Sequence, residues 1–253
     1  MVVDGVAVAV LAVVFVATAV RSAFGFGEAL VAVPLLALLI PVEVAAPLAC
    51  LLSVTVAAAV LVRDRHDVHL GGAWRLVLAT LPGVPLGLLL LTRVPEPAVK
   101  AVLGLVIVAF SAWSLAGRRP FELTDDRLAW PFGFAAGVLG GAYGMNGPPL
   151  AVYGTLRRWP PERFRATLQG YFLPASLAGL LGYALAGLWT ADVTRLYLLS
   201  LPVAAAAIVL GRAANRRLDA RSFLAYVHAG LVAVGVVLLA QSLRPFLPAV
   251  QFR

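Results

Sequence analysis

Ten apolar stretches, separated by short polar or glycine-rich segments, account for most of the chain. A full membrane span needs about 17–25 residues. Six stretches meet that length: 44–62, 71–91, 98–116, 164–187, 193–211 and 222–243. The stretch 5–20 falls just short, 128–142 is marginal, and 28–40 and 148–157 are clearly too short. The pattern predicts an all-α integral membrane protein in which some helices cross only part of the bilayer.

The chain matches itself at an offset of 119 residues. The letters FGFGE (24–28) fall on YGMNG (143–147), and PVE (41–43) falls on PPE (160–162). We therefore expect two repeats of five helical segments each, 1–119 and 120–253, which together form one transmembrane domain. Because five is odd, the second repeat is expected to be inverted relative to the first.

The basic residues support this count of segments. When the chain changes side after every stretch, fifteen of the 20 lysines and arginines fall on one side and five on the other. Cytoplasmic loops carry the excess of Lys and Arg, so the prediction places both termini outside. If each short helix is merged with its neighbour, the basic residues no longer separate onto one side of the membrane.

Composition agrees with a multi-pass membrane protein, because 62% of the residues are hydrophobic and 13% are charged. Soluble domains are about 45–50% apolar and about 25% charged. The net charge of +8 is explained by the loops, so we expect no nucleic-acid partner. The single cysteine, Cys50, excludes an intrachain disulfide and a Cys-rich metal site. We expect neither a metal nor a cofactor, and no enzyme motif is present.

Two glycine-rich stretches, RSAFGFGEAL (21–30) and GAYGMNGPPL (141–150), interrupt the helices at matching positions of the repeats. Non-helical backbone at membrane depth occurs where it is buried in protein or lines a wet cavity. In transporters with inverted repeats, broken helices place half-helix N-termini at a midplane substrate site. We therefore expect broken or re-entrant helix pairs whose turns meet near the midplane and offer backbone N–H groups to a small anion. Pro148 fits the start of a helix.

Polar residues near the turns have alternative interpretations. Asn146 either caps the short helix that follows it or contacts a ligand. Gln169 either binds the ligand or joins helices within the protein. Tyr143 has a hydroxyl for a ligand, although a buried tyrosine is often a packing residue.

Glu28 and Arg21 are the charged candidates. A carboxylate at membrane depth is a functional-site hypothesis by default. Glu28 is either a helix-start acid satisfied by the helix dipole and by Arg21, or a proton-coupling group. Arg21 is either the partner of Glu28, a direct anion contact, or the cytoplasmic flank of the first helix, an interpretation that the pattern slightly favours.

The stretches AFGFGEALVAVPLL (23–36) and GAYGMNGPPLAVYG (141–154) resemble the TauE/SafE sulfite-exporter family of membrane transporters. The resemblance covers nearly the whole chain, and Gly-Pro-Pro with a following tyrosine is its more specific part. It implies transport of small anions, typically sulfite, sulfonates and related sulfur-containing or short organic anions, along a path lined by the two turns. Family members usually carry a glycine in place of Glu28.

Together these observations predict a secondary transporter of the inner (cytoplasmic) membrane, with a small anion, the lipid bilayer and a coupling proton as its partners. Export of a sulfur-containing anion is the expected function. The alternatives are a carrier of a carboxylate or a metal cation, and an assembly subunit without a solute path. For the oligomeric state, both a monomer and a homodimer agree with the sequence. The substrate-binding candidates are Arg21, Gly25, Phe26, Gly27, Glu28, Tyr143, Gly144, Asn146, Gly147, Pro148 and Gln169.

Overall fold

The computed structural model describes residues 5–24, 27–63, 70–117, 122–215 and 220–243. These residues form ten α-helices and one short 3-10 helix, η2 (Asp126–Leu128). The α-helices are α1 (Gly5–Phe24), α2 (Glu28–Leu36), α3 (Val42–Arg63), α4 (Leu70–Arg93), α5 (Glu96–Ala116), α6 (Ala129–Tyr143), α7 (Gly147–Leu156), α8 (Pro161–Leu185), α9 (Ala191–Asn215) and α10 (Ala220–Leu243). Every predicted stretch therefore contains one helix, and the prediction of an all-α membrane protein is confirmed.

Within the described residues, six helices are long and apolar enough to cross a membrane, but they are not the six predicted. The helix α1 qualifies, because it continues to Phe24 and reaches 20 residues. The helix α8 does not, because its first turns, PERFRATLQ, are polar and only Gly170–Leu185 is continuously apolar. The length assigned to 5–20 was therefore wrong, whereas the span expected over 164–187 stays a prediction, because α8 has 25 residues.

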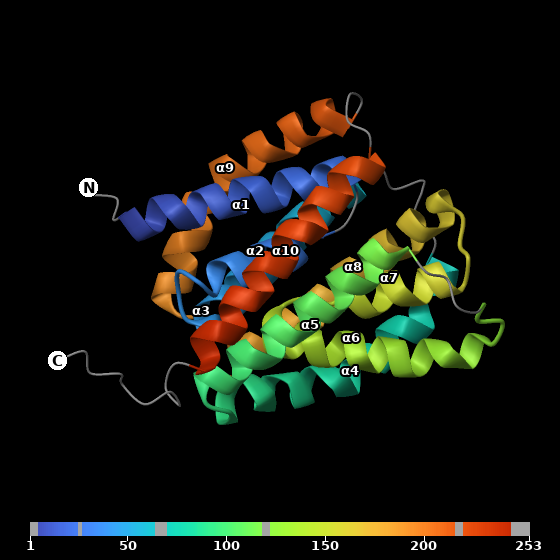
Figure 1. Ribbon diagram of the computed structural model, residues 1–253, viewed down its shortest axis with the longest axis horizontal. Coiled ribbons are helices and arrows are strands. Elements are labelled where there is room, and N and C mark those ends of the chain that lie inside the picture. Colours follow the sequence, from blue (N-terminus) through green and yellow to red (C-terminus); the bar gives the residue numbers. More distant parts are fainter. Residues whose placement is uncertain (1–4, 25–26, 64–69, 118–121, 216–219, 244–253) are drawn as a thin grey trace.

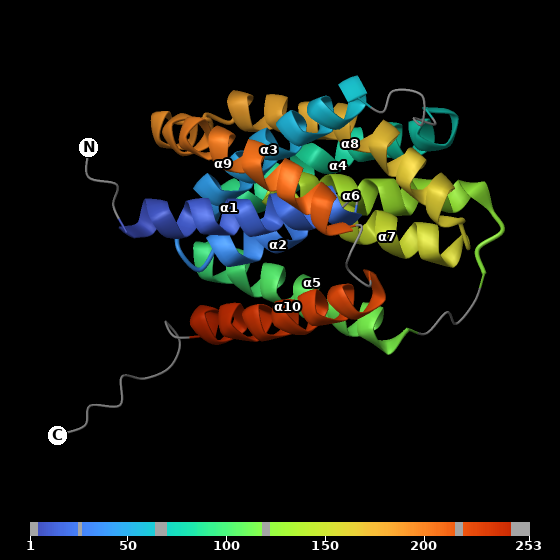
Figure 2. The same ribbon diagram turned by 90° about the horizontal axis from the view of Figure 1, so that it is seen from above.

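The short helices belong to two helical hairpins that enter the bundle from opposite ends. In Figures 1 and 2, α2 lies toward the end where α1 begins, whereas α7 lies toward the other end, beside the start of α6. With 9 and 10 residues, α2 and α7 extend about 14 and 15 Å, half of a hydrocarbon core of about 30 Å. The described residues beside the breaks, Gly27 and Gly144, therefore lie deep within the bundle. The first residue of α1 and the last of α10 lie at the same end (Figures 1 and 2).

The helices of the two halves pack against each other in equivalent pairs. The helix α1 packs mainly on α9, and its counterpart α6 packs on α4, the counterpart of α9. The helices α3 and α8 pack on each other, as do α5 and α10. The ends of α1 and α6, and the starts of α2 and α7 and of α3 and α8, are 119 residues apart. These features support the two repeats, whose inverted relation stays a prediction.

Glycines allow α4 and α6 to approach closely. A Cβ at Gly83 or Gly87 of α4, or at Gly137 or Gly141 of α6, would collide with the backbone of the other helix. Small residues spaced four apart are a common device for helix packing in membranes, where no hydrophobic effect drives apolar helices together. This pair fixes the position of the second hairpin.

Large apolar side chains cover the outside of the bundle. Leu105, Leu181, Leu198 and Val209 are 57–68% exposed although they lie within long apolar helices. A helix that is hydrophobic all round belongs either in a protein core or in a membrane. The exposed side chains therefore face lipid, while the largest fully buried ones, Tyr143, Tyr171 and Tyr183, lie inside.

Candidate functional site

The turns of the two hairpins meet at one small cavity. Its described lining comes from α1, α2, α3, α5, α6–α7 and α8: Arg21, Gly27, Glu28, Ala29, Leu30, Ser53, Phe110, Gly144, Asn146, Gly147, Phe172 and Ser176. The volume open to the centre of a water-sized sphere is about 20 Å³. That is room for about one water molecule, so little space is left at the site in this conformation.

The local sequence explains the shape of both turns. Gly27 precedes α2 with φ of 96°, and Gly144 ends α6 with φ of 64°. Both values lie in the left-handed region, which glycine adopts without the steric penalty of a Cβ. A Cβ at Gly144 would also come within 2.6 Å of the Ala46 carbonyl oxygen. Glycine therefore sets both the direction of the chain and its close approach to α3.

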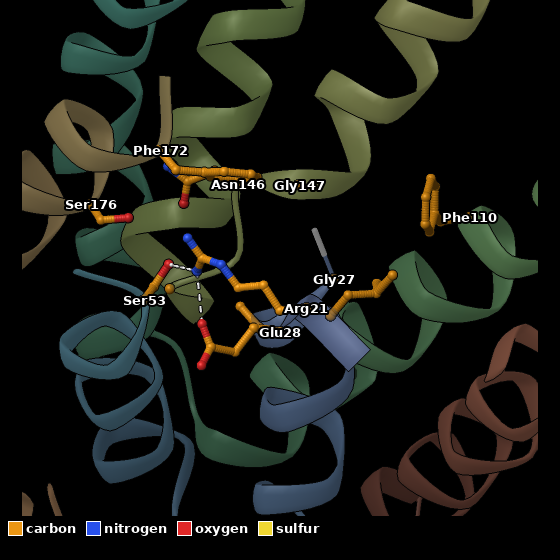
Figure 3. A pocket seen from close by; sticks show the side chains of 12 residues that line it. Arg21, Gly27, Glu28, Ser53, Phe110, Asn146, Gly147, Phe172 and Ser176 are labelled. Carbon is orange, nitrogen blue, oxygen red and sulfur yellow. Dashed lines mark hydrogen bonds and ion pairs between the residues drawn. The ribbon is translucent and has the colours of Figure 1, made fainter. Parts of the chain in front are cut away.

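A buried ion pair joins the first hairpin internally and to α3. Arg21 Nη1 donates to Glu28 Oε2 at 2.7 Å and to Ser53 Oγ at 2.8 Å (Figure 3). The other carboxylate oxygen, Glu28 Oε1, accepts a bond from the Thr18 hydroxyl at 2.9 Å. The side chains of Arg21 and Glu28 are only 4% and 2% exposed. Glu28 is thus paired with Arg21, as one of its two interpretations required.

The other edge of the Arg21 guanidinium has no partner among the described residues. Within this part of the chain, Nε and Nη2 are buried without a hydrogen bond, whereas buried donors are nearly always satisfied in proteins. Figure 3 shows the guanidinium between Glu28 and Ser53 and the turn that carries Asn146 and Gly147. The ring of Phe172 covers it, with 5.3 Å from Cζ to the ring centroid. Nε and Nη2 form one of the paired donor edges that bind two oxygens of an anion.

Burial decides between the interpretations of Arg21. A residue on the cytoplasmic flank of a helix would be exposed, whereas Arg21 is 96% buried and lines the cavity. The flank interpretation is therefore wrong. One of the fifteen basic residues assigned to the cytoplasmic loops lies inside the protein.

The two short helices do not offer the same donors to the cavity. In α2 the first backbone bond within the helix runs from Val31 N to Gly27 O, so the preceding N–H groups have no intrahelical acceptor. In α7 the second and third residues are Pro148 and Pro149, which carry no N–H. The positive end of the dipole is present in both helices, but α7 contributes fewer hydrogen bonds than the sequence prediction assumed.

Asn146 occupies the N-cap position of α7, but its side chain makes no capping hydrogen bond. Its Nδ2 donates instead to the Tyr171 hydroxyl at 3.4 Å, and that hydroxyl bonds to Thr80 Oγ1 at 2.6 Å. A Cβ at Gly140 would come within 2.6 Å of Asn146 Oδ1. The carboxamide is therefore held against α6 beside the cavity, and capping by its side chain is not observed.

The structure brings together six of the candidates proposed from the sequence: Arg21, Gly27, Glu28, Gly144, Asn146 and Gly147. Tyr143 points elsewhere, because its hydroxyl donates to the Val99 carbonyl at 2.9 Å on α5. Pro148 is buried in α7 but does not line the cavity. Gly25, Phe26 and the side chain of Gln169 lie outside the described residues.

Sequence reasoning missed several lining residues: Ser53, Phe110, Phe172 and Ser176. The repeat offered a signal for two of them, because Ser53 and Phe172 are 119 residues apart and both face the cavity. Phe110 carried no such signal. It reaches the cavity from α5, where the His228 ring of α10 packs against it with 5.5 Å between centroids.

The cavity suits an anion better than a cation. Among its described lining residues, only Arg21 and Glu28 are charged, and the carboxylate of Glu28 is already bonded to Arg21 and Thr18. The described residues contain no group of three or more His, Cys, Asp or Glu side chains that could hold a metal ion. At the described cavity lining, the side-chain donors without an acceptor are Nε and Nη2 of the positively charged Arg21 guanidinium.

Comparison with protein families gives a match over most of the chain. A model of the family described as sulfite exporter TauE/SafE matches residues 10–238, which is most of the chain. Neither the curated proteins nor the solved structures contain a match.

Proposed function

Because the chain belongs to the sulfite exporter TauE/SafE family of membrane transporters, we propose that it carries a small oxygen-bearing anion through the cavity at Arg21. The observation that supports this most strongly is the unpartnered edge of the guanidinium. A buried donor pair without acceptors costs free energy, and an anion with two oxygens on one centre would satisfy both nitrogens.

The hairpin turns complete the proposed anion site. The N-termini of α2 and α7 direct the positive ends of two helix dipoles toward the cavity, which favours an anion. Asn146 supplies a polar side chain on the far side of the guanidinium from Glu28 (Figure 3). Phe172 covers one face of Arg21, which keeps water away and strengthens the charge interaction.

We propose sulfite, a sulfonate or a related sulfur-containing organic anion as the substrate, and export across the cytoplasmic membrane as the direction. Two inverted repeats, 1–119 and 120–253, would alternate access by moving relative to each other. The small volume of the cavity agrees with a site that widens when the hairpins separate. Both termini would lie outside.

Glu28 is the proposed proton carrier. An anion at the free edge of Arg21 would place two negative charges around one guanidinium, and protonation of Glu28 relieves their repulsion. The only other charged group at the described cavity lining is Arg21 itself. A further titratable ring, His228 of α10, packs against the lining residue Phe110 and does not itself line the cavity.

The test is thermal unfolding of the purified protein in detergent with sulfite, an alkanesulfonate, thiosulfate, carboxylates and divalent cations. A ligand at 100 times its Kd adds about 2.7 kcal/mol to the free energy of unfolding when it binds only the folded state. We expect this stabilisation from a sulfur oxyanion, and we expect Asn146→Leu to reduce it.

The control is Gln241→Leu, the same kind of amide-to-leucine change in α10, outside the cavity lining. It should leave the response to the anion unchanged. Stabilisation by divalent cations alone would contradict the anion site and favour a cation carrier with Glu28 as ligand. An anion response that survives Asn146→Leu in full would contradict the position of the site.

A further inference from the structure

The two charged residues of the cavity lining balance each other electrically. Arg21 and Glu28 are its two charged lining residues within the described chain, and their side chains are 2.7 Å apart. A guanidinium buried to this degree is strongly disfavoured without a counter-charge. Glu28 therefore supplies, in the absence of substrate, the negative charge that a bound anion would supply.

The geometry separates the two anionic partners of Arg21. Glu28 uses Nη1, while the buried edge formed by Nε and Nη2 has no acceptor among the described residues. Substrate and carboxylate therefore do not compete for the same hydrogen bonds, but they share one positive charge. The Thr18 hydroxyl holds Glu28 Oε1 in place, so two residues of α1, Thr18 and Arg21, position the carboxylate.

We propose that Glu28 is the internal counter-anion of the empty carrier, whose pairing with Arg21 allows the cavity to change its side of access without a substrate. This rests on the proposed transport function and adds a second half-cycle to it. In the loaded half-cycle the substrate neutralises Arg21 and Glu28 carries the proton. In the empty half-cycle the ionised Glu28 neutralises Arg21. The buried charges are therefore balanced both in the loaded carrier and in the empty carrier while the side of access changes.

The two half-cycles predict that a mutation can affect net flux without affecting substrate exchange. Exchange of internal for external substrate uses only the loaded carrier, whereas net flux also needs the return of the empty carrier. Glu28→Gln imitates the protonated carboxyl but cannot neutralise Arg21. It should therefore preserve exchange and block net flux.

The experiment uses proteoliposomes and radiolabelled sulfite, with exchange measured against internal sulfite and net efflux measured into sulfite-free buffer. We expect Glu28→Gln to retain exchange within about twofold of wild type and to lose net efflux by at least tenfold. Sulfite should bind this variant at least as tightly as it binds wild type, because one neighbouring negative charge is gone. Glu28→Asp, which keeps the charge, should recover part of the net efflux.

Glu43→Gln is the matched control, because Glu43 is an exposed carboxylate in the first turn of α3. It should behave as wild type in both modes. Net efflux retained by Glu28→Gln, or an equal loss of exchange and efflux in a variant that elutes as a folded monodisperse protein, would overturn the proposal. Absence of exchange by the wild-type protein with sulfite and with an alkanesulfonate would instead refute the proposed transport function itself.

Discussion

Replacing Arg21 by lysine tests whether the open edge of the guanidinium binds the anion. Lysine keeps the positive charge beside Glu28, but it carries one compact ammonium instead of a planar fork. Its three donors have to serve Glu28 and Ser53, which Nη1 alone serves in the wild type. At most one donor then faces the ligand, whereas arginine offers both Nε and Nη2.

The magnitude follows from the lost hydrogen bond. Hydrogen bonds to charged groups contribute about 1.5–3 kcal/mol, so losing one weakens binding roughly 10–150-fold, at about 1.4 kcal/mol per factor of ten. For a 30-fold loss, the anion concentration that stabilises the wild type by about 2.7 kcal/mol stabilises the variant by about 0.9 kcal/mol. Stability without ligand should change less than in Arg21→Met, where the unpaired Glu28 costs about 3–5 kcal/mol.

The assay is isothermal titration of sulfite into the detergent-solubilised protein, with thermal unfolding of the same samples. Arg93→Lys is the matched control, because Arg93 is exposed in the last turn of α4. The reasoning is refuted if Arg21→Lys binds sulfite as tightly as the wild type does.

Three further predictions address coupling, packing and orientation. Glu28→Gln should flatten the pH dependence of sulfite exchange in proteoliposomes, and an unchanged pH profile would eliminate Glu28 as the proton carrier. Gly144→Ala should lower the free energy of unfolding by about 2–5 kcal/mol, because the left-handed backbone disfavours a Cβ and the backbone of α3 leaves no room for one. Thermal unfolding measures this loss. The control Gly230→Ala should show no such loss, because Gly230 has open space around it. In a background without the native cysteine, a membrane-impermeant maleimide applied to intact cells should label a cysteine at Glu96 but not one at Arg158, and the reverse result would invert the predicted topology.

The contents of the cavity could be predicted only in part from the sequence. Gly27, Gly144, Asn146 and Gly147 lie at the breaks themselves, so the local glycine and proline pattern was sufficient to find them. Tyr143 lies next to the same break, but its helix turns its hydroxyl toward α5. A shift of one residue rotates a side chain by about 100° around a helix, so closeness in sequence does not decide which side chains face a site.

The sequence by itself determined the helical elements, the two interrupted hairpins and the membrane environment, because apolar length, glycine and proline act locally. Only the tertiary structure decided that Arg21 lies in the cavity rather than in a loop, and that Ser53, Phe172 and Ser176 join it there. These placements depend on which face of α3 and α8 meets the hairpin turns. Helices that are apolar all round carry no stripe that marks this face, so the contacts of their neighbours select it.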